Sequence, residues 1–404
     1  MINALRGMKD LMGDEARRYR YITETAAEIA RRYGFEYIET PILEETRLFK
    51  RSVGESSDIV GKEMYQFTDK GGNDVCLRPE GTAGVVRAFI QAKLDRRQGL
   101  KSRFFYFGPM FRYERPQKGR LRQFHQFGVE SFGEASVEED FTLIIMLSEI
   151  FDALGIRYKV LLNSLGCSEC MPPYRERLVS HLHDIEDGLC DDCRRRIATN
   201  PIRVLDCKNE SCQELLKEAP RITHHLCESC NADFERLKSL LDDAGIAYEV
   251  DPNLVRGLDY YSGTAFEFVS DEIGAQSAIA GGGRYDRLVE FLGGKPTPGI
   301  GFAIGIERIM ELVCMPEPAR EGWYLGTMLS EALPSLLRFA RARRREGERV
   351  VVEYAPKGLK AHLKGADRSL ARYCGVVGED EYAKGEIWVK DLEAKEETII
   401  PLEI

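Results

Sequence analysis

A basic, aromatic stretch, FRYERPQKGRLRQFHQFGVE at residues 111–130, carries the side chains best suited to bind a nucleotide. Arg112 and Glu114 are two residues apart, so on one strand they would face the same side. The planar guanidinium of Arg112 can donate two parallel hydrogen bonds to a phosphate, and Phe124 offers a flat face for a base. An exposed basic hairpin with salt bridges is the alternative for this stretch alone.

Three further stretches place polar side chains beside small residues. In LRPEGTAG, Glu80 and Thr82 could hold an ammonium group, although both residue types also favour helix starts. In LVRGLDYYSGTAFEF, Arg256 precedes Tyr261, and a turn with core tyrosines is the alternative. In GIGFAIGIER, small residues precede Arg308, and strand-to-helix packing with a surface arginine is the alternative.

The segment AGGGRYDRL at residues 280–288 is expected to be a glycine-rich turn that leads into a helix. It lacks the contexts G-x-x-x-x-G-K-[ST] and G-x-G-x-x-G, which excludes a P-loop and a Rossmann dinucleotide site here.

Eight cysteines lie in four close pairs between residues 167 and 230. They are Cys167 and Cys170, Cys190 and Cys193, Cys207 and Cys212, and Cys227 and Cys230. In a long chain without an export signal, such pairs indicate metal ligation or buried thiols rather than disulfides. Two pairs can form a tetrahedral Cys₄ zinc site, so four pairs could form two. The outer pairs are expected to face each other, because the ends of an insertion join adjacent sheet elements, and buried reduced thiols remain the alternative.

The elements that position these residues are expected to form a sheet-based domain. Helical spacing occurs at residues 14–33 and 136–154, and two aromatic strands predict an antiparallel pair around 103–133. The stretch GFEYIETPILEE is expected to be a strand ended by Pro41. Residues 165–231 form a cysteine-rich, mostly helical insertion, after which strand patterns resume.

A change of pattern after Pro318 predicts a second domain. The last part of the chain alternates as βαβαββ, which predicts a small α/β domain at 322–404 behind a first domain at 1–321. The length of 404 residues agrees with two or three domains.

Composition sets the broad class. The chain is 43% hydrophobic and 30% charged, which is typical of a globular protein, and no apolar run approaches the roughly 18 residues of a membrane span. The start, MINALRGMKDLMGDE, has no apolar signal segment, so a cytoplasmic protein is expected. The net charge of −9 argues against non-specific coating of nucleic acid, although a local basic patch is compatible with it.

Taken as an ordered set, RPEGT, FRYERPQKGRLRQFHQ, RGLDYYSGTAFE, GGGRYD and GFAIGIER resemble the signatures of the histidyl-tRNA synthetases. FRYE and GIER resemble motifs 2 and 3 of class II synthetases, and GFEYIETPILEE resembles motif 1, the dimer-interface element. This resemblance implies an α+β fold: an antiparallel-sheet class II catalytic domain with a helical insertion, plus a C-terminal α/β anticodon-binding domain. It also implies a cytoplasmic homodimer that uses ATP with Mg²⁺ to form histidyl-adenylate and pyrophosphate, and then transfers histidine to the 3′ end of tRNA(His).

The resemblance implies roles for individual residues. Arg112 would hold the α-phosphate, with Arg256 opposite it where other class II enzymes use a metal ion, and Arg308 would complete the catalytic arginines. The implied ATP-binding residues are Arg112, Glu114, Arg120, Phe124 and Arg308, with the last two sandwiching the adenine. The implied histidine-binding residues are Glu80, Thr82 and Gln126 for the α-amino group and Glu130, Tyr261 and Tyr285 for the imidazole. The family gives no support for zinc.

Two other classes of protein would share some of these features. A regulatory paralogue, the histidine-binding subunit that partners ATP phosphoribosyltransferase, would share the catalytic fold but lose the ATP arginines and the C-terminal domain. This chain keeps Arg112, Arg256, Arg308 and that domain. A non-enzymatic zinc-containing RNA-binding protein would explain the cysteines but not RPEGT or RGLDYY.

Overall fold

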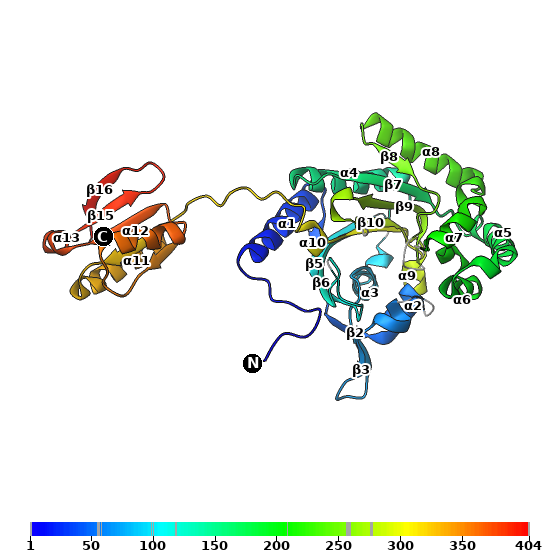
Figure 1. Ribbon diagram of the computed structural model, residues 1–404. Helices are drawn as coiled ribbons and strands as arrows, with labels where there is room; N and C mark the ends of the chain where they lie inside the picture. Colours follow the sequence, from blue (N-terminus) through cyan, green and yellow to red (C-terminus); the bar gives the residue numbers. More distant parts are fainter. Residues whose placement is uncertain are drawn as a thin grey trace. The chain divides into compact units, whose positions relative to one another are not determined.

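The computed structural model divides the chain into two compact units, Met1–Met315 and Pro316–Ile404 (Figure 1). It describes residues 2–54, 57, 59–97, 99, 101–117, 119–207, 209–255, 260–274 and 278–402. Within these residues, no helix is long and apolar enough to cross a membrane.

The first unit is built on one large, mainly antiparallel sheet. Its eight strands, in spatial order, are β1 (Glu36–Tyr37), β5 (Ser102–Phe111), β6 (Gln123–Phe132), β11 (Gly299–Gly305), β10 (Ala278–Arg284), β9 (Ser262–Val269), β7 (Lys159–Ser164) and β8 (Tyr248–Val250). The six central strands pair antiparallel, and only the two edge strands pair parallel to their neighbours. The expected antiparallel-sheet α+β fold and the antiparallel pair around 103–133 are therefore confirmed.

Long helices cover one face of this sheet. They are α1 (Gly13–Arg32), α4 (Val137–Ala153) and α8 (Glu228–Asp243), and their apolar sides share one core with alternate strand residues such as Phe105, Phe127 and Ile304. In α1 the buried residues Ile22, Ala26 and Ala30 recur every four positions, which gives a single apolar stripe. The predicted helices at 14–33 and 136–154 are thus confirmed (Figure 1).

The opposite face of the sheet carries shorter helices and the cleft described below. The helices α2 (Thr46–Val53), α3 (Thr82–Gln91) and α9 (Leu288–Phe291) share a second core with the other set of strand residues, including Tyr106, Met110 and Phe132. Because successive side chains of a strand point to opposite faces, one residue set of β5 and β6 builds the helical core while the other set faces the cleft.

The strand expected in GFEYIETPILEE is present as β1, which belongs to the large sheet and ends before Pro41. Pro41 lacks the N–H that would continue this ladder. Beyond it, β2 (Leu43–Glu45) joins β4 (Asp74–Leu77) and β3 (Gln66–Thr68) in a small separate sheet. The expectation for AGGGRYDRL was wrong: its glycines do not form a turn, because Ala280–Arg284 are part of β10 inside the sheet.

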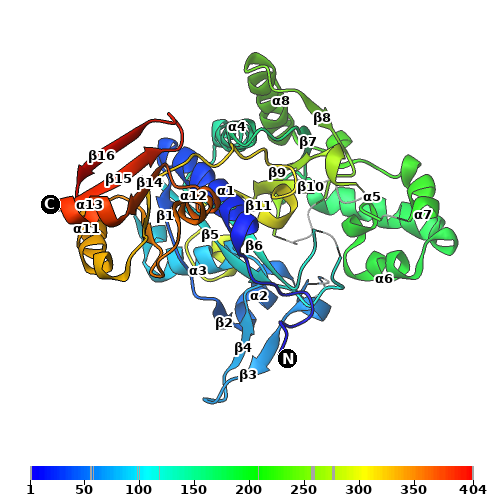
Figure 2. The ribbon, with the colours of Figure 1, turned by 60° about the vertical axis from the view of Figure 1, so that its left-hand side comes forward.

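The cysteine-rich insertion begins directly after β7 and consists of α5 (Met171–Asp184), α6 (Asp191–Thr199), α7 (Glu210–Leu215) and short 3₁₀ turns. These helices gather around their own apolar core, which includes Tyr174, Leu178 and Ile197 (Figure 2). The next helix, α8, starts beside Cys227 in the insertion and ends packed on α4. The chain then returns to the sheet as β8.

The second unit has a five-stranded sheet in the order β13 (Val350–Val352), β12 (Trp323–Thr327), β14 (Tyr373–Val377), β15 (Glu386–Asp391) and β16 (Glu397–Pro401). Helix α11 (Leu333–Arg345) packs against Trp323 and Leu325, and α12 (Leu359–Arg368) packs near Tyr324 on the other face. Relative to the expected βαβαββ pattern, the structure adds α13 (Glu379–Lys384) and β16.

Candidate active site

A cleft lies on the face of the large sheet that the long helices leave uncovered. It encloses about 1000 Å³ of free space, including its open mouth. Part of its lining is made of small residues on β10 and β11, namely Ala278, Ala280, Gly281, Gly301, Ala303 and Gly305. Since these residues carry little or no side chain, a ligand in the cleft can lie directly on the sheet. Most of the rest of the lining comes from polar and aromatic side chains.

One end of the cleft is rich in arginine. Arg112, Arg120 and Arg308 line it together with Glu114 and Phe124. The guanidinium carbon of Arg112 lies 5.1 Å from the centre of the Phe124 ring. Burial, and then the positive charge of Arg120, lower the pKa of Arg308. Three neighbouring guanidinium groups with two nearby carboxylates, Glu114 and Glu267, form a site that an anionic ligand would stabilise.

The arginine end is held by specific contacts. Arg112 donates from Nε to the carbonyl of Pro79 at 2.9 Å, and Arg120 pairs with Glu114 at 3.1 Å. The expectation that Arg112 and Glu114 sit on one strand was wrong, because β5 ends at Phe111. The main-chain N–H of Arg112 nevertheless donates to the carbonyl of Arg122 at 2.9 Å, so the hairpin pairing continues past the strand end.

Glu80, Thr82 and Gln126 form another part of the cleft lining. Glu80 accepts hydrogen bonds from the main-chain N–H groups of Thr82 at 2.6 Å and Ala83 at 2.9 Å, so it caps the start of α3 while its side chain borders the cleft. Burial raises the pKa of Glu80. The buried Oε1 of Gln126 has no hydrogen-bond partner among the described residues. A buried acceptor beside a buried carboxyl group is suited to a cationic ligand group.

Glu130 lies just beneath this lining and is 1% exposed. Its carboxylate accepts hydrogen bonds from the hydroxyls of Thr82 at 2.7 Å, Tyr106 at 3.1 Å and Tyr285. Burial raises the pKa of Glu130 to about 8, although these hydroxyls oppose the effect. A Cβ at Gly301 would overlap with the Glu130 carboxylate, so only glycine allows this close approach of β11 to Glu130.

Four polar side chains that the sequence did not single out also line the cleft: Tyr106, Tyr260, Glu267 and Glu307. Tyr106 is separated from Arg112 by an even number of residues, so the alternation that links Arg112 to Glu114 could have found it. Glu307 accepts hydrogen bonds from the main-chain N–H of His125 at 2.8 and 3.0 Å. It thereby fixes α10 (Ile306–Ile309), which carries Arg308, to β6.

The cleft therefore gathers most of the residues expected to bind a nucleotide and an amino acid. The predicted residues that line it are Glu80, Thr82, Arg112, Glu114, Arg120, Phe124, Gln126, Tyr261 and Arg308. Glu130 and Tyr285 stand behind this lining and are hydrogen-bonded to each other. Arg256 lies outside the described residues.

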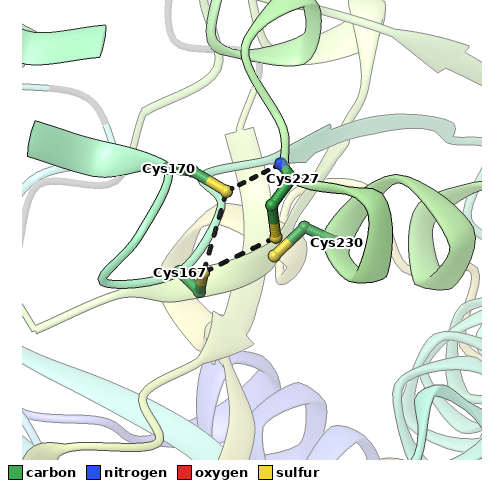
Figure 3. Close-up of side chains that lie close together, drawn as sticks. All are labelled: Cys167, Cys170, Cys227 and Cys230. Carbon is green, nitrogen blue, oxygen red and sulfur yellow. Dashed lines mark hydrogen bonds between the residues drawn. The ribbon is translucent and has the colours of Figure 1, made fainter. Parts of the chain in front are cut away.

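The eight cysteines of the insertion form two groups, and both groups have the expected composition. The outer cluster consists of Cys167, Cys170, Cys227 and Cys230 (Figure 3), and the inner cluster consists of Cys190, Cys193, Cys207 and Cys212. In each cluster all four sulfur atoms lie within 4.8 Å of one another, and all eight cysteines are free thiols. The grouping of outer with outer and inner with inner pairs is confirmed.

One thiol in each cluster is prone to ionise. Burial raises the pKa of Cys167, but hydrogen bonds from the main chain of Cys170 and Glu169 outweigh it and lower this pKa to about 7. In the inner cluster, a hydrogen bond from the main chain of Cys193 lowers the pKa of Cys190 to about 7. The thiolate is the form that binds metal, so both clusters are suited to a soft or borderline cation.

Comparisons with known proteins agree with these features. The family model for histidyl-tRNA synthetase matches residues 7–309. The histidine–tRNA ligase of Sulfurovum sp. is 68% identical over all of this chain and 99% of that protein, and the histidine–tRNA ligase of Sulfurimonas denitrificans is 63% identical over the full length of both. The crystal structure of the apo histidyl-tRNA synthetase of S. aureus superposes with a TM-score of 0.83 at 35% identity, covering 100% of this chain and 98% of that one.

We predict that Glu130→Gln changes how stability depends on pH. The folded pKa of about 8 lies above the ordinary value of 4.5, so Glu130 favours folding in its protonated form. The wild-type protein should therefore lose unfolding free energy as the pH rises from about 4.5 through 8, by up to about 1.4 kcal/mol per pH unit. Glutamine cannot ionise and should flatten this decline in urea unfolding between pH 5 and 9. Parallel curves for the two proteins would contradict the raised pKa.

Proposed function

The chain belongs to the histidyl-tRNA synthetase family, and on that premise we propose how its cleft activates histidine with ATP and charges tRNA(His). The observation that carries the proposal is a single cleft whose lining combines arginines with buried carboxyl and amide groups. An aminoacyl-adenylate has the matching charges, because it joins a phosphate to an α-ammonium group. The chain matches full-length relatives that are named histidine–tRNA ligases, which argues against a regulatory subunit and against a non-enzymatic RNA-binding protein.

In the first step, a carboxylate oxygen of histidine attacks the α-phosphorus of ATP. A new P–O bond forms, the bond to the bridging oxygen breaks, and pyrophosphate leaves with that electron pair. Arg112 and Arg256 hold the α-phosphate and stabilise the negative charge that shifts during attack, while Arg120 meets the outer phosphates. Phe124 and Arg308 enclose the adenine, and Glu114 contacts its edge. Positioning and preorganised charge can supply most of the rate enhancement for such a step.

Histidine is selected at the other end of the cleft. Glu80, Thr82 and the unpartnered Oε1 of Gln126 receive the α-ammonium group. Glu130 and Tyr261 pair with the imidazole nitrogens, and Tyr285 holds Glu130 in place through its hydroxyl. A side chain without both imidazole nitrogens would leave buried polar groups unpaired, which typically costs roughly 10⁴-fold or more in selectivity.

Magnesium enters with ATP in this proposal. The carboxylate of Glu267 lines the cleft and is a hard oxygen ligand of the kind Mg²⁺ prefers, so it suits the ion. When bound to the outer phosphates, Mg²⁺ neutralises part of their charge.

In the second step, a hydroxyl of the 3′-terminal ribose of tRNA(His) attacks the carbonyl carbon of the adenylate. The ester bond to tRNA forms and AMP leaves. We propose that the second unit, from the Pro316 boundary onward, is the anticodon-binding domain. Exposed Arg341 and Arg345 on α11 are free to meet phosphates, whereas Arg343 packs over Trp323 and pairs with Glu346.

The two thiol clusters are proposed as structural zinc sites, and the protein as cytoplasmic. Four thiolates in a closed set suit structural rather than catalytic zinc, which keeps an open coordination position. Both clusters lie in the insertion and the catalytic cleft is lined by other residues, so zinc has no part in the proposed chemistry.

We further propose a homodimer. The segment that resembles motif 1 and the adjoining hairpin expose large apolar side chains: Tyr37 is 48%, Ile42 42%, Leu43 43% and Phe67 47% exposed. A group of exposed apolar residues is typical of a surface that a partner covers, and a second copy of the chain is the partner that the family implies.

We predict that Arg256→Ala lowers histidine-dependent pyrophosphate exchange by roughly 10²–10³-fold, because it removes a preorganised donor from the α-phosphate. Histidine affinity, measured separately by calorimetry, should change little. Arg256→Lys should recover only part of the rate, since a point charge cannot reproduce a two-pronged contact. Arg287→Ala, at an exposed arginine that does not line the cleft, is the matched control. Near-normal exchange in Arg256→Ala, or a defect confined to histidine affinity, would refute the assigned role.

We predict that the protein sediments as a dimer at micromolar concentration and that Leu43→Asp shifts it toward the monomer with loss of exchange activity. A buried, unpaired carboxylate at an apolar interface is strongly unfavourable. Ile399→Asp introduces the same charge at a 53% exposed residue of the second unit and should leave the dimer intact. A fully active wild-type monomer would show that the proposed interface is wrong.

A further inference from the structure

We propose that the outer cysteine cluster is a Zn²⁺ site that positions the histidine end of the catalytic cleft, whereas the inner cluster holds a second Zn²⁺ that serves the core of the insertion. The inference rests on the proposed function, because it links a metal site to histidine binding. The two clusters have the same chemistry, so the difference between them must come from what each is attached to.

The geometry of the outer cluster fits one tetrahedral ion. Four thiolates bound at about 2.3 Å to a zinc ion at tetrahedral angles lie about 3.8 Å from one another. The sulfur of Cys167 lies 3.7 Å from that of Cys170 and 3.9 Å from that of Cys227 (Figure 3). These separations match the edges of such a tetrahedron and are far longer than the roughly 2.05 Å of a disulfide. In the inner cluster, the sulfurs of Cys190 and Cys207 are likewise 3.9 Å apart.

Helix ends and main-chain donors face the outer cluster. Cys170 lies at the start of α5 and Cys227 at the start of α8, so two helix N-termini point their positive ends at the cluster. The main-chain N–H of Cys227 donates to the sulfur of Cys170 at 3.1 Å, and that of Glu169 donates to the sulfur of Cys167 at 3.4 Å. Such bonds to ligand sulfurs stabilise metal-bound thiolates. Three of the four outer cysteines are only partly buried, which also gives an ion access.

The outer cluster closes the insertion at its base. Cys167 and Cys227 are 60 residues apart in the sequence, and one ion would tie together the chain that leaves β7 and the chain that enters α8. Gly166 allows this arrangement, because it adopts φ of +66° and a Cβ there would lie 2.7 Å from the Cβ of Cys170. The crosslink would restrict the long loop in the unfolded chain and fix both of its ends in the folded one.

The same base is hydrogen-bonded to β9, the strand that begins directly after Tyr261. The main-chain N–H of Leu165 donates to the carbonyl of Gly263 at 2.6 Å, and the N–H of Gly263 donates to the carbonyl of Gly166 at 2.8 Å. Gly263 belongs to β9 and closely follows Tyr261, which lines the cleft. The residues that connect Tyr261 to Cys167 are therefore few and mostly fixed by main-chain bonds.

A small apolar cluster provides a second connection. Leu165, Val255 and Ala265 form its buried part, and Tyr261 packs against it together with Met171 and Ile202 from the insertion. The buried Nδ2 of Asn163 also donates to the carbonyl of Leu254 at 2.9 Å. The outer cluster is thus connected both to Leu254 and Val255, which precede Tyr261, and to Gly263, which follows it. The inner cluster bonds within the insertion, where the N–H of Cys190 donates to the sulfur of Cys212 at 3.2 Å.

The test uses the full-length protein purified without chelator, with zinc measured by elemental analysis and thiols by titration. We expect two zinc ions per chain in the wild type and one in each of the double variants Cys227→Ser/Cys230→Ser and Cys193→Ser/Cys207→Ser. Cys314→Ser, at an exposed cysteine outside both clusters, should keep both ions and unchanged kinetics. Replacing zinc by Co²⁺ should give the visible spectrum of tetrahedral thiolate coordination at both sites.

Pyrophosphate exchange then separates the roles of the two sites. The outer double variant should raise KM for histidine about tenfold, a size typical of losing a positioning contact, and at least fivefold more than the inner variant does, with KM for ATP little changed. Because the serine variants could fail to fold, Cys230→His serves as a second variant: it retains a zinc ligand and should restore both the ion and KM. Circular dichroism checks folding in each case.

The outcomes are distinguishable. Absence of zinc, with eight titrating thiols, would overturn the metal sites in favour of buried reduced cysteines, whether or not the enzyme is active. Loss of the outer zinc with an unchanged KM for histidine would overturn the positioning role while leaving the site. Failure of the wild type to exchange pyrophosphate with histidine would refute the proposed function, and the zinc content would still report on the clusters.

Discussion

The structure around the cleft depends on one buried carboxylate. Glu130 lies in the middle of the large sheet and is almost fully removed from solvent, so its polar atoms must find partners inside the protein. Those partners are hydroxyls from three different elements: Thr82 at the start of α3, Tyr106 on β5 and Tyr285 after β10. Because one carboxyl group accepts hydrogen bonds from all three hydroxyls, these bonds hold α3, the sheet and the loop after β10 in fixed positions relative to one another. Gly301 completes the arrangement, because any side chain there would displace Glu130.

From this fixed point the cleft extends toward the arginines. The small residues of β10 and β11 let a ligand lie along the sheet between the histidine end and the nucleotide end. In the proposed orientation the ammonium group lies near Glu80 and the phosphate near Arg112, whose Nε donates to the carbonyl of Pro79 beside Glu80. The insertion joins the sheet beside the histidine end through Leu165, Gly166 and Gly263, so a metal site at its base lies where it can influence amino-acid binding.

Much of this could be predicted from the sequence wherever a signal is local. Two aromatic-rich stretches of the sequence predicted the antiparallel pair, and the resemblance selected nine residues that line one cleft. The grouping of cysteines followed from the requirement that both ends of an insertion meet at the sheet. Predictions failed where the conformation or role of a residue depends on residues that are distant in the sequence. The glycines of β10 are typical of a turn in the sequence. In the structure they belong to a strand, and because they have no side chains a ligand can lie directly against its backbone. The sequence allowed Glu80 to be either a helix cap or a ligand-binding residue. In the structure it caps α3 and also lines the cleft. Tyr106 was not selected, although it alternates with Arg112 along the chain; its hydrogen bond to Glu130 on the neighbouring strand has no signal in the sequence.

The central claim is that one cleft reads histidine at one end and the nucleotide at the other. The most direct test is titration calorimetry with two non-hydrolysable aminoacyl-sulfamoyl adenosines, one carrying histidine and one carrying phenylalanine. Both fill the nucleotide end equally, so any difference in affinity reports on the histidine end. We expect the histidine compound to bind at least about 10³-fold more tightly, because phenylalanine leaves the polar groups around Glu130 and Tyr261 unpaired. Equal affinity for the two compounds would contradict the account.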